Sequence, residues 1–170
     1  VATAAYVIVT PQFATIPYLQ AFDADLGDTY TYSVSGPTKT WTYYAAGQAA
    51  AINGFGSTDT EEDWLILPGL NMNLNSDETM SFGTWKRYGT LGENDYLKLM
   101  YSANYAGVGD PSTATWTEIP FDLPLTDQAW TPSGMLDLSG ISGTAVFFAF
   151  KYKGTPGNFA QWNVDNISIV

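Results

Sequence analysis

The stretch Phe159-Ala-Gln-Trp-Asn-Val-Asp-Asn-Ile167 alternates large apolar residues with polar ones close to the C-terminus. Alternation with a period of two indicates a half-buried β-strand, and it predicts that Trp162, Val164 and Ile167 pack on one side of a sheet. Strand-like segments separated by turn residues recur along the chain, at 29–34, 63–67, 78–88, 96–102, 115–121 and 130–135. This length and spacing predict an all-β fold built as an antiparallel β-sandwich.

Two further segments depart from simple alternation. Thr144–Tyr152 is apolar almost throughout, which predicts a central strand covered on both faces. The alanine-rich segment Thr42–Ile52 predicts a turn or two of helix, and Gly47 and Gly54-Phe-Gly56 argue against more. We therefore expect almost no helix elsewhere.

Two carboxylates are placed where the ends of the chain would meet. Asp165 lies in the middle of the last strand, and Asp23 follows the early apolar run Tyr18-Leu-Gln-Ala-Phe22. If the first and last strands lie side by side, these acids repel each other unless a cation or hydrogen-bond donors separate them. The pattern favours a β-sandwich in which a metal ion links the two strands, and it does not favour an active site. The alternative is that these acids are turn residues that face the solvent.

Length and residue types bound the function. The 170 residues suit one domain, which we place at 17–170, with 1–16 as a linker or edge strand. The chain has no Cys and no His. Their absence excludes thiolate nucleophiles, Ser-His-Asp catalysis and histidine- or cysteine-ligated zinc. We expect no enzymatic activity; Asp95, Glu118 and Asp122 are not paired in the way a glycosidase needs.

The net charge of −11, with only six Lys and Arg residues, bears on partners. Nucleic acid is not expected as a partner, because phosphate binding needs clustered basic side chains. Membrane insertion is not expected either, because no apolar run approaches ~20 residues. Aromatic residues make up 15% of the chain, which suits strands and also sugar- or protein-binding faces.

Four landmarks recur in a fixed order. They are Phe22-Asp23, then Glu61-Glu-Asp-Trp-Leu-Ile-Leu-Pro68, then Tyr96-Leu-Lys-Leu-Met-Tyr-Ser102 closed by Thr115-Trp116, and last Asp137-Leu-Ser139, Phe148-Ala-Phe-Lys-Tyr152 and Trp162-Asn-Val-Asp-Asn-Ile167. In this order and spacing the chain resembles the cleaved-adhesin or "choice-of-anchor J" type of jelly-roll domain, found in secreted and surface proteins of bacteria. The resemblance covers roughly residues 17–170.

The resemblance implies a two-sheet jelly roll related to carbohydrate-binding modules. It also implies a structural calcium that ties the first strand to the last, with Asp23 and Asp165 as ligands beside backbone carbonyls. Two departures weaken that site: Asp23 stands where many relatives have Glu, and Asn166 replaces an acid. The resemblance also implies that the protein is secreted or lies at the cell surface. Its partners would then include other domains of a larger parent chain or further copies of itself.

Two other groups of residues are candidates for binding. The acidic run Asp59-Thr-Glu-Glu-Asp63 either flanks a second calcium, repels neighbouring strands at an edge, or forms a solvated loop. The aromatic rings near the ends of the expected strands have two interpretations: they form a platform on which a sugar stacks, or they pack in the core. Trp64, Trp162 and Phe148 are expected in the core. The residues selected for ligand binding are Trp85, Tyr88, Trp130, Lys86, Arg87 and Asn104.

These observations favour a non-catalytic adhesion or binding module, whose partner is a glycan or a protein surface. The alternative is a structural spacer or filament subunit that binds itself or a neighbouring domain. A sugar binder should expose several rings in one concave patch. A structural subunit should instead expose apolar residues at the chain ends or along an open edge strand.

Overall fold

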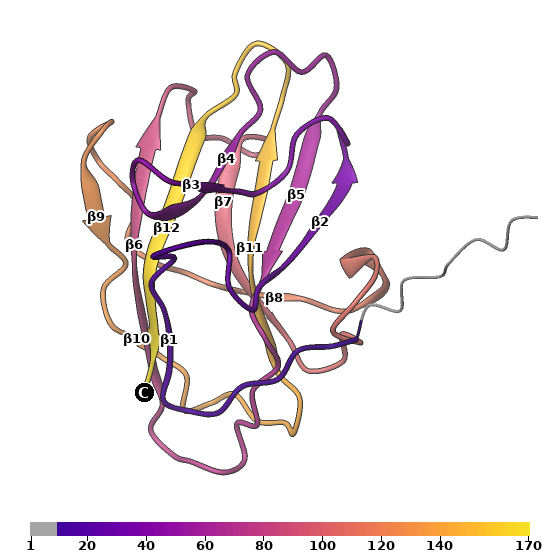
Figure 1. The fold of residues 1–170 in the computed structure, drawn as a ribbon, viewed down its shortest axis with the longest axis vertical. Helices are drawn as coiled ribbons and strands as arrows, with labels where there is room; N and C mark the ends of the chain where they lie inside the picture. Colours follow the sequence, from indigo (N-terminus) through magenta and orange to yellow (C-terminus); the bar gives the residue numbers. More distant parts are fainter. Residues whose placement is uncertain (1–9) are drawn as a thin grey trace, which may run out of the picture.

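The computed structural model describes residues 10–170, which form two antiparallel sheets packed face to face (Figure 1). The first sheet has seven strands: β1 (Tyr18–Gln20), β3 (Thr42–Tyr44), β4 (Ala49–Asn53), β6 (Thr79–Arg87), β9 (Trp130–Pro132), β10 (Leu136–Asp137) and β12 (Gln161–Ile169). The second has five: β2 (Tyr30–Ser35), β5 (Glu61–Ile66), β7 (Tyr96–Ser102), β8 (Thr117–Ile119) and β11 (Phe147–Gly154).

The predicted jelly-roll class is confirmed. Within residues 10–170 the helical content is one 3₁₀ turn, η1 (Pro111–Thr113). No helix in this part of the chain is long and apolar enough to cross a membrane. Residues 1–9 lie outside the described range, so most of the expected linker does too. Of the rest of that segment, Phe13 forms an isolated parallel bridge with Gly69.

Strand β12 runs through the middle of the seven-stranded sheet, between β6 on one edge and β4 with β1 on the other (Figure 1). Its pairing with β1 sets Tyr18 opposite Ile169, which confirms that the first and last strands are neighbours. On the shared edge, β4 pairs as far as Val164 and β1 pairs from Ile167 onward. Asp165 and Asn166 therefore lie at the junction between these two partners.

A β-bulge sets which way the last strand faces. Between Asp165 and Ser168, β12 has one residue more than the facing part of β6, and Asn166 adopts a φ of 53°. Asn tolerates this left-handed conformation better than most residues. Because the bulge shifts the alternation by one residue, Ile167 joins Trp162 and Val164 in the core, as predicted.

The central position of β11 explains its continuous apolar sequence. The strand lies between β5 and β7. Phe148 and Phe150 face the main core between the sheets, whereas Phe147 and Ala149 belong to a second cluster on the other face. This second cluster also holds Trp64. Both faces of the strand are covered, as the sequence predicted.

The expected helix at Thr42–Ile52 is wrong. This segment forms the hairpin of β3 and β4, in which Tyr43 pairs with Ala50. Strand β4 also pairs with β12, and Ala50 and Ile52 face the main core. Pairing on both edges and burial of Ile52 outweigh the helix preference of the alanines, which amounts to less than about 1 kcal/mol per residue.

Candidate ligand-binding cleft and cation sites

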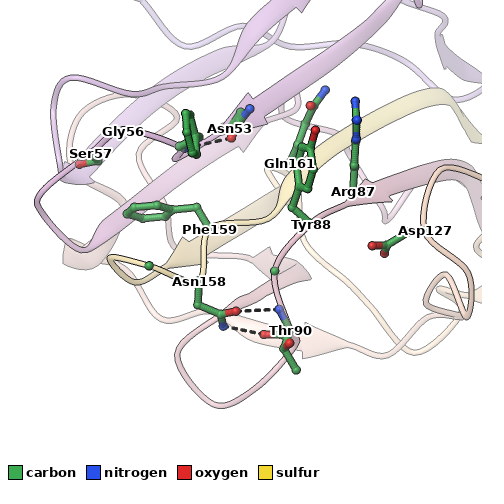
Figure 2. A pocket seen from close by; sticks show the side chains of 13 residues that line it. Asn53, Gly56, Ser57, Arg87, Tyr88, Thr90, Asp127, Asn158, Phe159 and Gln161 are labelled. Atoms are coloured by element: carbon green, nitrogen blue, oxygen red, sulfur yellow. Dashed lines mark hydrogen bonds between the residues drawn. The ribbon is translucent and has the colours of Figure 1, made fainter.

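An open cleft of about 790 Å³ lies at one end of the seven-stranded sheet (Figure 2). It forms where β4 and β6 end and β12 begins, so three segments distant in sequence meet there. The residues that line it are Asn53, Phe55, Gly56, Ser57, Arg87, Tyr88, Gly89, Thr90, Asp127, Gly157, Asn158, Phe159 and Gln161. We call it the Tyr88 cleft.

Two rings at this cleft are exposed to solvent. Phe55 is 78% exposed and Tyr88 is 51% exposed. The backbone amide of Phe55 is held by a 3.0 Å hydrogen bond to Oδ1 of Asn53. Tyr88 has a φ of 63°, and the guanidinium carbon of Arg87 lies 4.3 Å from its ring centre. Both rings are thus positioned by local contacts and leave apolar area uncovered.

Polar side chains stand in a row beside these rings. Arg87, Gln161 and Asn53 are direct neighbours across β6, β12 and β4, so they project from the same face of the sheet. Figure 2 shows the three side chains extending in a common direction. Nε of Arg87 is buried and has no hydrogen-bond partner in residues 10–170. The row therefore offers planar amide and guanidinium groups next to exposed rings.

The lower edge of the cleft is fixed by a reciprocal hydrogen-bond pair, drawn as dashed lines in Figure 2. Thr90 donates its backbone N–H to Oδ1 of Asn158, and Nδ2 of Asn158 donates to the Thr90 carbonyl, both at 2.8 Å. Gly89 has a φ of 62°, and a Cβ there would lie 2.7 Å from the Asn158 carbonyl oxygen. The two loops can approach this closely because position 89 is glycine.

Lys86 and Asn104 lie apart from the other predicted ligand-binding residues. Nζ of Lys86 donates to the carbonyls of Tyr88 and Gly89 at 2.8 and 3.1 Å, and pairs with Asp127 at 2.6 Å. Lys86 is buried, and it fastens the turn behind the cleft. Asn104 follows β7 in the other sheet, where its Oδ1 accepts hydrogen bonds from the Ser102 hydroxyl and from the backbone N–H of Thr115.

The two selected tryptophans pair with each other. Trp85 on β6 lies opposite Trp130 on β9. A Cβ at Gly83 would be 3.3 Å from the Trp130 indole, so the ring packs over the backbone of Gly83, which has no side chain. Trp130 remains 47% exposed and borders a second hollow of about 420 Å³ that also includes Asp165. The structure therefore divides the predicted platform between two sites on one sheet.

Asp23 and Asp165 lie close enough to influence each other. Burial raises the pKa of Asp165, and the charge of Asp23 raises it further. Both oxygens of Asp165 accept hydrogen bonds from Asn166, from its N–H at 2.7 Å and its side chain at 2.8 Å, and the backbone hydrogen bond opposes the rise in the pKa. Each acid also has a left-handed neighbour, Phe22 with a φ of 48° and Asn166. The two carboxylates fit a hard cation in charge and donor type.

Residues 10–170 contain no group of three or more Asp or Glu side chains arranged to hold a metal ion. Two of the three glycosidase candidates are held by other partners: Glu118 pairs with Lys98 at 2.7 Å, and Asp95 accepts hydrogen bonds from Thr155. The Tyr88 cleft has Asp127 as its single acidic lining residue among those described. A glycosidase needs two carboxylates across its cleft, which this lining does not supply.

The acidic run 59–63 is not simply a solvated loop. Asp59 is exposed and Glu62 pairs with Lys151 at 3.0 Å, but Glu61 and Asp63 are completely buried. The sequence contained the signal for this burial. Glu61, Asp63 and Leu65 are spaced two apart on β5, so the acids share the inward face of the core residue Leu65.

Known proteins support the fold. A family model described as "Domain of unknown function (DUF5017)" matches residues 13–170. The K3 cleaved adhesin domain of Lys-gingipain from Porphyromonas gingivalis matches with a TM-score of 0.64 and 16% identity, over 90% of this chain and 96% of that chain. The K1 domain matches with a TM-score of 0.62 and 17% identity, over the same shares. No curated protein matches. The expected likeness to cleaved-adhesin domains is therefore confirmed for the fold.

Proposed function

This chain belongs to the family described as a domain of unknown function (DUF5017), and from that premise we propose that it is a non-catalytic, secreted or cell-surface module that binds a glycan in the Tyr88 cleft. The observation that carries the proposal is the pair of exposed rings, Phe55 and Tyr88, beside the row of Arg87, Gln161 and Asn53. Sugars present flat C–H faces together with many hydroxyl groups. Exposed rings and planar hydrogen-bonding groups match those two features.

The residue chemistry supports binding without turnover. The chain lacks His and Cys, which serve as base or nucleophile in many hydrolases. The fastened lower edge, with its Thr90–Asn158 hydrogen bonds, supports a preformed site that loses little conformational freedom when a ligand binds.

We further propose a structural calcium between β1 and β12, held by Asp23 and Asp165. Such an ion supplies positive charge that offsets the mutual repulsion of the two carboxylates. Support comes from the rise that the charge of Asp23 produces in the pKa of Asp165. The residues beside both acids adopt left-handed backbone conformations, which cost free energy. A bound ion would offset that cost, which supports the proposal.

A glycan array followed by calorimetry tests the binding proposal. Wild-type protein should bind at least one neutral glycan, and Phe55→Ala should weaken that binding about tenfold, which corresponds to ~1.4 kcal/mol. Tyr44→Ala is the matched control, because Tyr44 is a partly exposed ring of the same sheet outside the cleft. Absence of binding to every neutral glycan, or equal losses in both variants, would contradict the proposal.

The structural-subunit alternative has its own observation in its favour. Phe13, Leu19 on β1 and the terminal Val170 are exposed apolar residues. Exposed apolar residues can pack against another copy or against a neighbouring domain. Sedimentation velocity at increasing protein concentration tests this reading: reversible assembly that Leu19→Lys removes would favour the subunit role.

A further inference from the structure

The strongest unexplained feature of the molecule is a pair of acids inside the sandwich. Glu61 and Asp63 are both 0% exposed, and they lie on the same side of β5 as the core residue Leu65. All four of their carboxylate oxygens lack a hydrogen-bond partner among residues 10–170. Buried ionised groups without partners cost several kcal/mol each, so something must compensate for them.

No basic side chain in residues 10–170 forms an ion pair with either acid. The three ion pairs of the described chain use Lys86, Lys98 and Lys151, and none includes Glu61 or Asp63. Lys39 lowers the pKa of Glu61 only by its charge and forms no ion pair with it. The acids therefore face each other without a cationic partner from the chain.

The nearby side chains offer oxygen atoms. The hydroxyls of Ser57 and Ser33 lie near Glu61 and Asp63, where each opposes the rise in the neighbouring pKa. Both hydroxyls already donate their protons elsewhere, Ser57 to the carbonyl of Asp59 at 3.3 Å and Ser33 to the carbonyl of Ser35 at 3.2 Å. The Ser57 oxygen also accepts the backbone N–H of Asp59 at 3.1 Å, which leaves it one lone pair, and the Ser33 oxygen accepts no hydrogen bond among residues 10–170. The result is a group of oxygen acceptors from β2, β5 and the loop after β4.

Glycine lets the chain close over this group. Gly36 has a φ of 72°, and a Cβ there would lie 2.1 Å from Oε2 of Glu61. The backbone that follows β2 thus covers the carboxylate directly. On the inner side, Nε1 of Trp41 donates to the Asp63 carbonyl at 3.3 Å. The acids are thus covered by the backbone at Gly36 on one side and by Trp41 on the other.

We propose that Glu61 and Asp63, with the Ser33 and Ser57 hydroxyls, form a buried site for a hard divalent cation of the calcium type. Carboxylate and hydroxyl oxygens without soft or imidazole donors are the ligand types that such cations prefer. The site belongs to β5 of the five-stranded sheet, whereas Asp165 belongs to β12 of the seven-stranded sheet. It is therefore a separate site, which links the start of β5 to the loops at 36 and 57.

The test uses the folded 170-residue chain in the Asp165→Asn background, which leaves only the new site. After removal of metal by chelator, calorimetric titration with calcium should show one ion per chain. Adding Asp63→Asn to this background should abolish that binding. Glu62→Gln is the matched control: it neutralises the acid between the two, whose carboxylate pairs with Lys151, and should leave calcium binding intact.

Terbium provides a second measurement that reports position. Trp41 lies beside Asp63, so terbium bound at this site should emit sensitised luminescence that calcium displaces. A proton shared by the two acids is the competing explanation. It predicts no calcium binding in the Asp165→Asn protein, no terbium emission, and an Asp63→Asn variant that melts at or above the temperature of its parent. That combination would overturn the proposal.

Discussion

The guanidinium carbon of Arg87 lies 4.3 Å from the ring centre of its sequence neighbour Tyr88. Consecutive residues of a regular strand point to opposite faces, but the positive φ of Tyr88 ends the strand and brings the ring back toward the arginine. The contact holds the ring at the edge of the cleft. Cation–π contacts of this kind contribute about 0.5–1 kcal/mol at exposed positions.

Tyr88→Ala should therefore weaken glycan binding about tenfold or more, since it removes a stacking surface and releases Arg87. Tyr88→Phe should retain most of the affinity, because the ring remains. Calorimetry with the best glycan from the array measures both variants. If Tyr88→Phe lost as much affinity as Tyr88→Ala, the hydroxyl and not the ring would be the important group.

Lys86 and Lys98 should respond differently to removal of their charge. Lys86→Met leaves two carbonyls and Asp127 without their buried donor, so the free energy of unfolding should fall by about 2 kcal/mol. Lys98 is exposed and pairs with exposed Glu118, so Lys98→Met should cost less than about 1 kcal/mol. Urea denaturation measures both. Equal losses would contradict the structural role assigned to Lys86.

The sequence was sufficient for β5, β7, β11 and β12 because strand patterns are local, but it was not sufficient for β3 and β4, where the alanine-rich segment predicted helix. Period-two alternation identifies which residues of β5, β7 and β12 face the core, whatever their neighbours in space. The cleft was only partly predictable for the opposite reason. Tyr88 and Arg87 carry a chemical signal, but Phe55, Asn158 and Gln161 reach the site only because β12 pairs with both β4 and β6. Which distant strands pair with each other cannot be predicted from the residue pattern of any one segment.

Calcium should stabilise the fold measurably. An ion that binds only the native state adds ~2.7 kcal/mol at a hundredfold excess over its dissociation constant. For a domain of this size that corresponds to a rise in melting temperature of about 5–10 °C. Asp165→Asn should remove much of the calcium response, because it takes away one of the two carboxylates. Identical thermal melts of the wild type in calcium and in chelator would exclude both cation sites.

In chelator, stability should fall as the pH rises. Burial raises the pKa of Asp63 to about 8 and also raises the pKa of Glu61 and of Asp165. The native state then keeps protons that the unfolded chain releases near pH 4, so the free energy of unfolding decreases between about pH 4 and 8. Asp63→Asn should flatten the upper part of this profile. Urea titrations from pH 5 to 8.5 measure it, and a wild-type profile without slope would contradict the burial of these acids.

Polyanionic glycans should bind weakly or not at all. The chain carries −11 net charge with six basic residues, so a sulfated or uronate-rich polymer meets repulsion over most of the surface. The screening length at physiological salt is ~8 Å, which confines this repulsion to groups near the contact. Among the described residues that line the Tyr88 cleft, Arg87 is the single basic side chain, and Asp127 pairs with Lys86 behind it. One free positive charge is not the basic cluster that a polyanion needs.

The basic residues outside the cleft do not combine into one patch that would reverse this expectation. Lys86 and Arg87 lie on β6 of one sheet, whereas Lys151 and Lys153 lie on β11 of the other. Heparin and alginate should therefore pass almost unretained through a column that carries the immobilised protein, in chelator and at low and moderate salt. Calcium can bridge carboxylates and raise retention, so the comparison in chelator is the decisive one. Tight retention there that weakens as salt rises would show that local charge, and not the net charge, governs which glycan this module accepts.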